Sequence, residues 1–373
     1  MESAGYNESM KFWPKDVPFF WMTFALTLLG LLTLYSVSSV QGIDQFNDSL
    51  YFLRKQLFFA CVGFVSMLFL SRLRPEFFLK NSPYLIGIIF LLLLAIMIPG
   101  LGFSTKGGTR WLNLGGFRFQ PSEFAKIGLM IFFASRLSRD RNIFSKWKEE
   151  LVLPFGVLVA FLLLFMLQPD FGNTVILSLV ILSLVFLAGA PWKYLWIMCG
   201  SSAVAFVGLM LAQPYRVQRF LLFLDPWKDP QNGSYQIIQS FIAFFRGGWF
   251  GVGLGNSRSK LYFLPEVKTD FIASIFAEEV GVVGFSVILL LYGLMILRGL
   301  KIAQKAKEPS HYLLAAGATL LLGFQALLNL AVVLSLLPTK GLPLPFVSMG
   351  GSSLLASMIL CALVQSVAGA SEK

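Results

Sequence analysis

Long apolar runs dominate the chain, and short polar segments separate them. A helix of roughly 20 apolar residues crosses a hydrocarbon core of about 30 Å. Ten runs approach that length, so the pattern predicts an all-α polytopic membrane protein with about ten transmembrane helices. The runs cover residues 17–39, 56–71, 82–99, 122–137, 151–168, 173–190, 193–212, 270–299, 311–337 and 347–369.

The placement of Lys and Arg between the runs predicts how the chain is oriented. Cytoplasmic loops hold an excess of these residues, and an even number of spans places both termini on that side. We therefore expect a cytoplasmic segment at 1–16, one ten-helix domain at 17–369 and a cytoplasmic tail at 370–373. Residues 213–269 form a long extracytoplasmic loop between helices 7 and 8, and its stretch 235–250 is predicted to lie on or partly in the membrane as a short helix.

Composition agrees with a membrane protein, but the charge balance is unusual. Of 373 residues, 56% are apolar and 13% are charged, which excludes a soluble globule and a disordered chain. Lys and Arg number 30 against 19 Asp and Glu, a net charge of +11. The orientation rule accounts for only about half of these cations. Many of the others lie in 213–269, which suits a surface that binds an anionic amphiphile.

Several ionisable residues fall at membrane depth, where a charge is costly and marks a candidate functional site. Glu123 and Lys126 are three residues apart and share a helix face, so they form a structural pair, a functional pair or both. Asp170 follows an apolar run, where a helix cap is the alternative to a functional role. Asp270 opens the eighth run. Trp111 lies at the membrane entry, where an interfacial aromatic residue is equally expected.

These residue types suit chemistry on a lipid-linked head group. A carboxylate can act as general base toward a hydroxyl, and cations stabilise charge on a leaving phosphate. Arg219, Arg246, Arg258 and Lys260 in the long loop are candidates for pyrophosphate or glycan contacts, with plain surface cations as the alternative. A transporter of the same lipid would show the same features. No metal site is legible, no cofactor is identified and no nucleic-acid partner is expected, although a divalent cation could assist pyrophosphate binding.

Five long motifs carry a resemblance over nearly the whole chain. They are RWLNLGGFRFQPSEFAK, QPDFGN, FLDPWKDPQNGSYQIIQS, GGWFGVGLGNSRSKLYFLPEVKTDFI and GLPLPFVSMGGSS. Their order and membrane positions resemble the SEDS family of bacterial membrane proteins, which includes FtsW, RodA and SpoVE. The finer pattern is most similar to the division branch, FtsW. Lys268 departs from the family, which commonly has His at that position.

The resemblance implies a peptidoglycan glycosyltransferase that polymerises lipid II into β-1,4-linked strands, with inversion, at the outer face of the bacterial cytoplasmic membrane. It implies that Asp270 is the catalytic carboxylate. It also implies that Trp111, Glu123, Lys126 and Asp170 belong to a central cavity that binds substrate. The partners it implies are a class B penicillin-binding protein and other division proteins, at the septum.

Three other functions remain open at this point. The chain could move lipid II across the membrane as a flippase, or serve elongation as a RodA-type polymerase. It could also be a division scaffold whose catalysis belongs to its partner. Polymerisation of lipid II by the purified protein separates a polymerase from the flippase and the scaffold.

Overall fold

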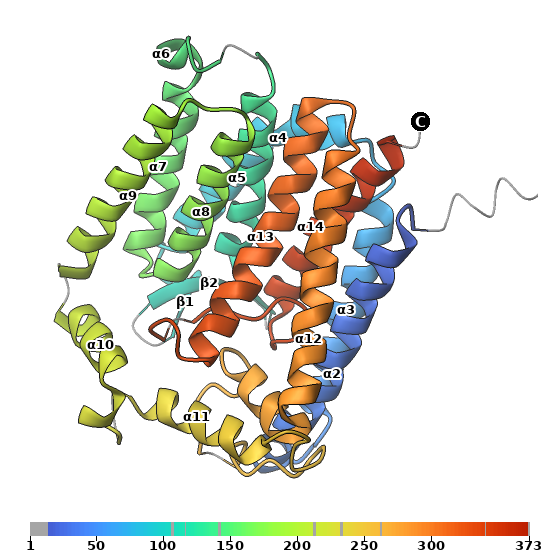
Figure 1. Ribbon diagram of the computed structural model, residues 1–373, viewed down its shortest axis with the longest axis vertical. Coiled ribbons are helices and arrows are strands. Elements are labelled where there is room, and N and C mark those ends of the chain that lie inside the picture. Colours follow the sequence, from blue (N-terminus) through green and yellow to red (C-terminus); the bar gives the residue numbers. More distant parts are fainter. Residues whose placement is uncertain are drawn as a thin grey trace, which may run out of the picture.

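The computed structural model describes residues 14–105, 108–115, 117–140, 143–211, 214–231, 234–261, 263–339 and 341–371. Most of the expected cytoplasmic segment, residues 1–13, and the last two residues of the tail lie outside this described part. The chain is mainly helical, as Figure 1 shows. Its helices are α2 (Val17–Phe46), α3 (Tyr51–Leu70), α4 (Pro75–Ala95), α5 (Pro121–Leu137), α6 (Trp147–Glu150), α7 (Val152–Leu167), α8 (Phe171–Leu187), α9 (Trp192–Leu211), α10 (Pro214–Leu224), η2 (Pro226–Lys228), α11 (Tyr235–Gly247), α12 (Ile272–Gln304), α13 (Pro309–Val333) and α14 (Gly351–Ser371).

Each of the ten apolar runs coincides with one of the longer helices. Within the described residues, six helices are long and apolar enough to cross a membrane, namely α2, α3, α4, α12, α13 and α14. Helices α7 and α8 are apolar and shorter. This is the pattern of a multi-pass membrane protein, whereas the count of ten spans stays a prediction. The short helix expected within 235–250 is α11, and α10 precedes it in the same long segment.

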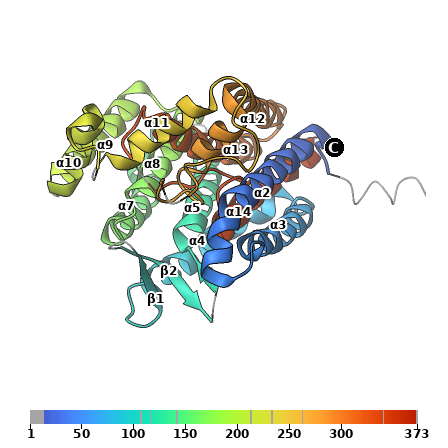
Figure 2. The same cartoon turned by 90° about the horizontal axis from the view of Figure 1, so that it is seen from below.

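Most residues of α5, α13 and α14 are buried, and the other long helices lie around these three (Figures 1 and 2). Small side chains let α13 approach its neighbours: a Cβ added at Gly317 would lie only 2.9 Å from the side chain of Met130 on α5. The outer helices instead expose large apolar side chains such as Trp196 and Val204. In a membrane these side chains face lipid.

Both ends of the described chain meet at one end of the bundle, at the top of Figure 1. The carboxylate of Asp16 caps α2 by accepting the Phe19 N–H at 3.0 Å, and Arg298 of α12 donates to it at 2.8 Å. The backbone N–H and C=O of Asp16 both bond to Gln365 of α14, each at 2.7 Å. We call this the terminal end, and the opposite end, which carries α10 and α11, the loop end.

The expectation of an all-α fold was wrong in one region. Between α4 and α5 the chain forms an antiparallel three-stranded sheet of β1 (Gly102–Thr105), β2 (Gly108–Leu114) and β3 (Phe117–Phe119). The pairing runs Phe103 to Trp111 and Leu112 to Phe119. Gly115, in the β2–β3 turn, has φ of +58°, which glycine tolerates without a Cβ clash. The strands have only three to seven residues, so each is too short to show a clear alternation of apolar and polar residues.

Helix α12 is broken at Gly281, whose φ is +70°. A glycine loop, residues 247–255, enters the break and restores the backbone hydrogen bonds that the break removes. The Val252 N–H donates to the carbonyl of Glu278 and the Gly253 N–H donates to that of Glu279, both at 3.0 Å. In the other direction, the N–H groups after the break donate to Gly248 and Trp249. No side chain fits at Gly281, since a Cβ there would lie 2.4 Å from the Gly251 nitrogen.

The segment before α14 is buried although it is not helical. We call residues 341–346 the proline loop, because Pro343 and Pro345 remove two backbone donors and leave carbonyls that need outside partners. Side chains from the surrounding helices supply these donors, including the Tyr292 hydroxyl to Pro345. Gly30 of α2 packs against the backbone of Phe346, where a Cβ would lie 2.5 Å from its oxygen. The loop therefore fixes several helices at once.

Candidate active site

Asp270 immediately precedes the turn into α12, and the backbone around it is held at three consecutive carbonyls. The Met349 N–H donates to Lys268 at 2.8 Å. The Ser348 hydroxyl donates to Thr269 at 2.5 Å, and the amide of Asn329 donates to Asp270 at 3.0 Å. These donors come from α13 and from the segment after the proline loop. Distant parts of the chain therefore fix the position of the backbone that carries the Asp270 carboxylate.

The Asp270 side chain is partly exposed and lies next to glycine. A Cβ added at Gly341 would lie 3.4 Å from Asp270 Oδ2, so the glycine leaves the carboxylate room. Lys268, two residues earlier, places its Nζ 3.6 Å from the ring centroid of Phe52. Partial burial lowers the pKa of Lys268, and the charge of Glu266 opposes that shift.

Glu123 and Lys126 form the pair that their spacing predicts. Their charged atoms lie 3.0 Å apart on α5, and the side chains are only 2% and 1% exposed. Pro121 starts this helix at its first position, where a missing N–H costs nothing. Lys126 also donates to Gln325 Oε1 of α13 at 3.1 Å. The pair is therefore joined to a second helix.

Asp170 is both a cap and part of a buried polar cluster. Its side chain accepts the Asn173 N–H at the start of α8, and its other oxygen accepts from Ser122 at 2.9 Å and from the Asn173 amide at 2.8 Å. Ser122 directly precedes Glu123, so this cluster adjoins the ion pair. Arg110 of β2, which precedes Trp111 in the sequence, donates to the carbonyls of Gln168 and Pro169. It thereby ties the sheet that bears Trp111, which is partly exposed, to the Asp170 turn.

The four loop cations lie in different settings. Arg219 on α10, Arg246 in the last turn of α11 and Arg258 are exposed. Lys260 is 5% exposed, and its ammonium contacts Glu279 at 3.2 Å, Ser36 at 3.1 Å and the Gly255 carbonyl at 2.5 Å. Lys260 thus supports the loop internally, whereas the three arginines lie at the surface.

The neighbouring carboxylate of Glu278 organises the same loop. It accepts from the Ser257 hydroxyl at 2.5 Å and from the N–H groups of Arg258 and Ser259 at 3.2 and 3.3 Å. Glu278 and Glu279 are consecutive on α12 and bind different partners. Together they fix the backbone from which the Arg258 side chain projects.

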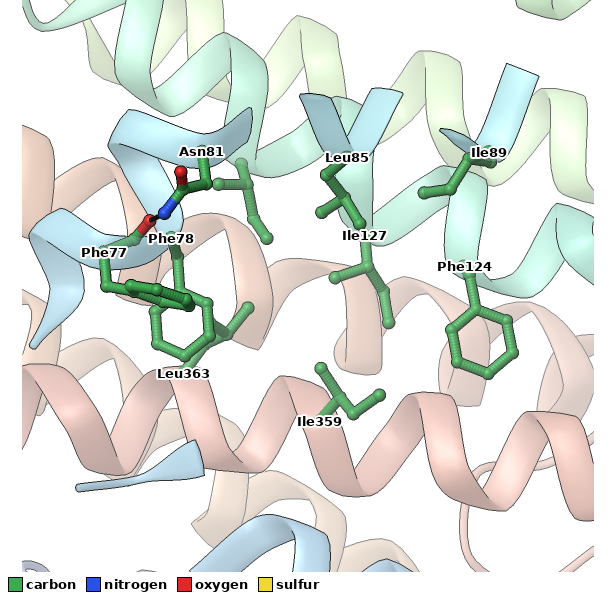
Figure 3. A pocket seen from close by; sticks show the side chains of 10 residues that line it. Phe77, Phe78, Asn81, Leu85, Ile89, Phe124, Ile127, Ile359 and Leu363 are labelled. Carbon is green, nitrogen blue, oxygen red and sulfur yellow. Dashed lines mark hydrogen bonds between the residues drawn. The ribbon is translucent and has the colours of Figure 1, made fainter. Parts of the chain in front are cut away.

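An apolar groove of about 250 Å³ is lined by α4, α5 and α14 (Figure 3). Phe124 and Ile127, which flank Glu123 and Lys126 in the sequence, line it from α5, and Leu85 lines it from α4. The only hydrogen bond drawn among its lining residues joins the Asn81 amide to the Phe77 carbonyl. The groove thus suits a hydrocarbon chain.

Metal ligands do not gather in the described part of the chain, where no group of three or more His, Cys, Asp or Glu side chains could hold an ion. Sequence reasoning also missed Gln325 and Asn329, two buried amides of α13. Their signal was available, since amides four residues apart in an apolar span share one helix face. Neither side chain is charged, so ionisable residues in apolar runs do not reveal them.

Comparison with known proteins gives one consistent family. Residues 17–373 match the family model for cell cycle proteins of the FtsW, RodA and SpoVE type. A probable peptidoglycan glycosyltransferase FtsW of Geobacter sulfurreducens is 40% identical over 354 residues, 94% of each chain. The stage V sporulation protein E of Bacillus subtilis is 37% identical, covering 89% of this chain and 91% of the relative.

Solved structures agree with this match. A chain of a peptidoglycan synthase complex that coordinates polymerization and crosslinking superimposes with a TM-score of 0.79 at 30% identity, covering 96% of this chain and 98% of that one. The rod shape determining protein RodA of Thermus thermophilus gives a TM-score of 0.71 at 27% identity, with the same coverage.

Proposed function

Because the chain belongs to the FtsW, RodA and SpoVE family of cell cycle proteins, we propose that it polymerises lipid II into β-1,4-linked glycan strands. We further propose a ten-span topology with both termini in the cytoplasm of a bacterium and the loop end at the outer face of the cytoplasmic membrane. The similarity to FtsW relatives favours septal synthesis during division over elongation.

In this proposal Asp270 is the general base. Its carboxylate takes the proton from the 4-hydroxyl of the acceptor N-acetylglucosamine. The resulting oxygen attacks the anomeric carbon of the donor N-acetylmuramic acid as the bond to undecaprenyl pyrophosphate breaks, and the configuration inverts. The support of three consecutive carbonyls around Asp270 carries this assignment, because a base must be held at a fixed distance from the proton it abstracts.

The other parts of the site serve binding. Trp111, Glu123, Lys126 and Asp170 belong to the substrate cavity, in which the Glu123–Lys126 pair and the Asp170 cluster are buried side by side along α5. Arg219, Arg246 and Arg258 are exposed at the loop end and suit the pyrophosphate. Lys260 acts by holding the loop that carries Arg258. The apolar groove beside α5 suits the isoprenyl chain of the substrate.

Polymerisation by the purified full-length protein in lipid vesicles tests the assignment. We expect strands from the wild type and a loss of at least about 100-fold in kcat for Asp270→Asn. The matched control is Asp225→Asn, an acid of the same long segment that pairs with Lys228 at 3.5 Å. A folded Asp270→Asn variant with normal kcat would exclude Asp270 as the base. If neither protein polymerises and both speed lipid II across the bilayer, the flippase function is correct.

Cross-linking of the strands requires a partner in this proposal. A class B penicillin-binding protein is the expected one, with other division proteins around it, and the solved synthase complex supports such an assembly. We also expect contact with this partner to raise the polymerisation rate. Equal rates with and without the purified partner would argue against such activation. A divalent cation for the pyrophosphate is tested by adding a chelator to the same assay.

The groove has its own test. Leu85→Trp narrows it from α4, so we expect KM for lipid II to rise several-fold with kcat little changed. Leu91→Trp is the control, since Leu91 lies on the same helix and is 66% exposed. Equal KM values in the two variants would exclude the groove as the binding site of the lipid chain.

A further inference from the structure

Two buried amides on α13, Gln325 and Asn329, connect parts of the site that are distant in sequence. They are four residues apart and therefore lie on one helix face. Their exposures are 3% and 1%, so both side chains are almost completely buried. A buried amide in an apolar span is costly unless its donors are used. The partners of these two amides are therefore informative.

Asn329 joins Asp270 to the proline loop. Its Nδ2 donates to the Asp270 carbonyl at 3.0 Å and to the Leu342 carbonyl at 2.6 Å. Its Oδ1 accepts no hydrogen bond from the described residues. The side chain is thus used as a double donor, and each of its two hydrogens serves one of the two loops that meet at Asp270.

Gln325 joins the same loop to the ion pair. Its Nε2 donates to the Pro343 carbonyl at 3.3 Å, and its Oε1 accepts from Lys126 at 3.1 Å. Leu342 and Pro343 are consecutive, so the two amides hold adjacent carbonyls of a loop in which proline leaves few donors of its own. An unbroken series of contacts runs from Glu123 through Lys126, Gln325 and the proline loop to Asn329 and Asp270.

We propose that Gln325 and Asn329 are positioning residues that couple the location of Asp270 to the buried Glu123–Lys126 pair. Asn329 fixes the backbone from which the carboxylate projects, and Gln325 fixes the proline loop relative to α5. The role assigned to Asp270 rests on the proposed polymerase function. The coupling itself is a property of the fold and is measured separately.

The test compares Asn329→Leu and Gln325→Leu with Gln365→Leu. Leucine resembles asparagine in size and cannot donate. Gln365 is the matched control, because it is an equally buried amide on α14 that bonds to Asp16 at the terminal end. Hydrogen exchange of the full chain in lipid nanodiscs is measured by mass spectrometry for residues 263–271 and 341–350.

We expect exchange in both segments to accelerate in Asn329→Leu, and in 341–350 to accelerate in Gln325→Leu. Gln365→Leu is expected to leave both segments unchanged. In the polymerisation assay we expect kcat to fall about 10-fold to 100-fold for Asn329→Leu with KM within about twofold, because misplacement of a base affects the chemical step. Asn329→Gln keeps the amide donors and is expected to recover part of this loss.

A second comparison asks whether Asn329 acts through Asp270. Adding Asn329→Leu to Asp270→Glu, where the carboxylate is already displaced, is expected to cost less than the same change in the wild type. Full additivity would overturn the proposal, as would unchanged exchange in Asn329→Leu or an equal fall of kcat in Gln365→Leu. If the wild type makes no polymer, the proposed function fails, and the exchange data still decide whether the coupling exists.

Discussion

Two buried lysine–glutamate pairs in this protein have the same chemistry and different architecture. Glu123 and Lys126 lie on a single helix, and their link to another helix is Gln325. Lys260 and Glu279 join a loop to a helix, and Ser36 of α2 contacts both charged groups. The first pair belongs to the proposed substrate cavity, whereas the second fastens a surface loop. Burial of charge therefore indicates a function only when its surroundings are known.

The largest effect is expected when the first pair is broken. Lys126→Met leaves Glu123 buried without its cation, which should cost about 3 to 5 kcal/mol of unfolding free energy. The double variant Glu123→Gln/Lys126→Met should recover most of that stability and none of the polymerisation. Denaturant titration in detergent, with the activity assay beside it, measures both. If the unfolding free energy of Lys126→Met lay within about 1 kcal/mol of the wild-type value, the prediction would be wrong.

Helix α12, which carries Glu279, should be sensitive to substitution at its break. Gly281→Ala places a Cβ against the inserted glycine loop at a positive φ, so we expect a loss of about 2 to 4 kcal/mol. Gly293→Ala on the same helix meets no atom within 4 Å and is the control. It should be neutral or stabilising, since alanine favours helix. Equal melting temperatures for the two variants would show that the break tolerates a side chain.

Breaking the second pair directly should have a smaller effect. In Glu279→Gln, Lys260 keeps the Ser36 hydroxyl and the Gly255 carbonyl, so a loss of about 1 to 2 kcal/mol is expected. Exchange should accelerate in residues 256–261 and stay unchanged near Lys126. Glu149→Gln, an exposed acid on α6, controls for loss of charge alone. If Glu279→Gln destabilises as strongly as Lys126→Met, the two pairs are equivalent after all.

The smallest effect concerns Lys268, which lies over an aromatic ring. Its folded pKa is below the ordinary 10.5, so the folded protein binds fewer protons than the unfolded chain between those two values. Stability should then rise slightly as pH increases through that window. In Lys268→Met, the melting temperature should rise less than in the wild type as the pH is increased through the alkaline range to 10.5. If wild-type stability instead fell over this pH range and the variant showed no such fall, the pKa of Lys268 would be raised by folding, and the prediction would be wrong.

Much of the fold was readable because lipid imposes a simple rule on helices. Apolar runs located the ten longer helices to within seven residues at either end, and a spacing of three predicted the Glu123–Lys126 pair. Lys260 could not be paired in this way, since Glu279 is 19 positions away and Ser36 is 224. The sheet was missed because its strands have at most seven residues. Contacts that depend on loop closure leave no periodic signal.

The support of Asp270 has a consequence for how the protein is made. A ribosome produces the carboxylate well before Asn329, Ser348 and Met349, which hold the surrounding carbonyls. A nascent chain that has inserted α12 into the membrane thus has its proposed base and lacks the means to hold it in place. We expect chemistry to begin only after residue 349 has left the ribosome, so that unfinished copies at the membrane stay inert.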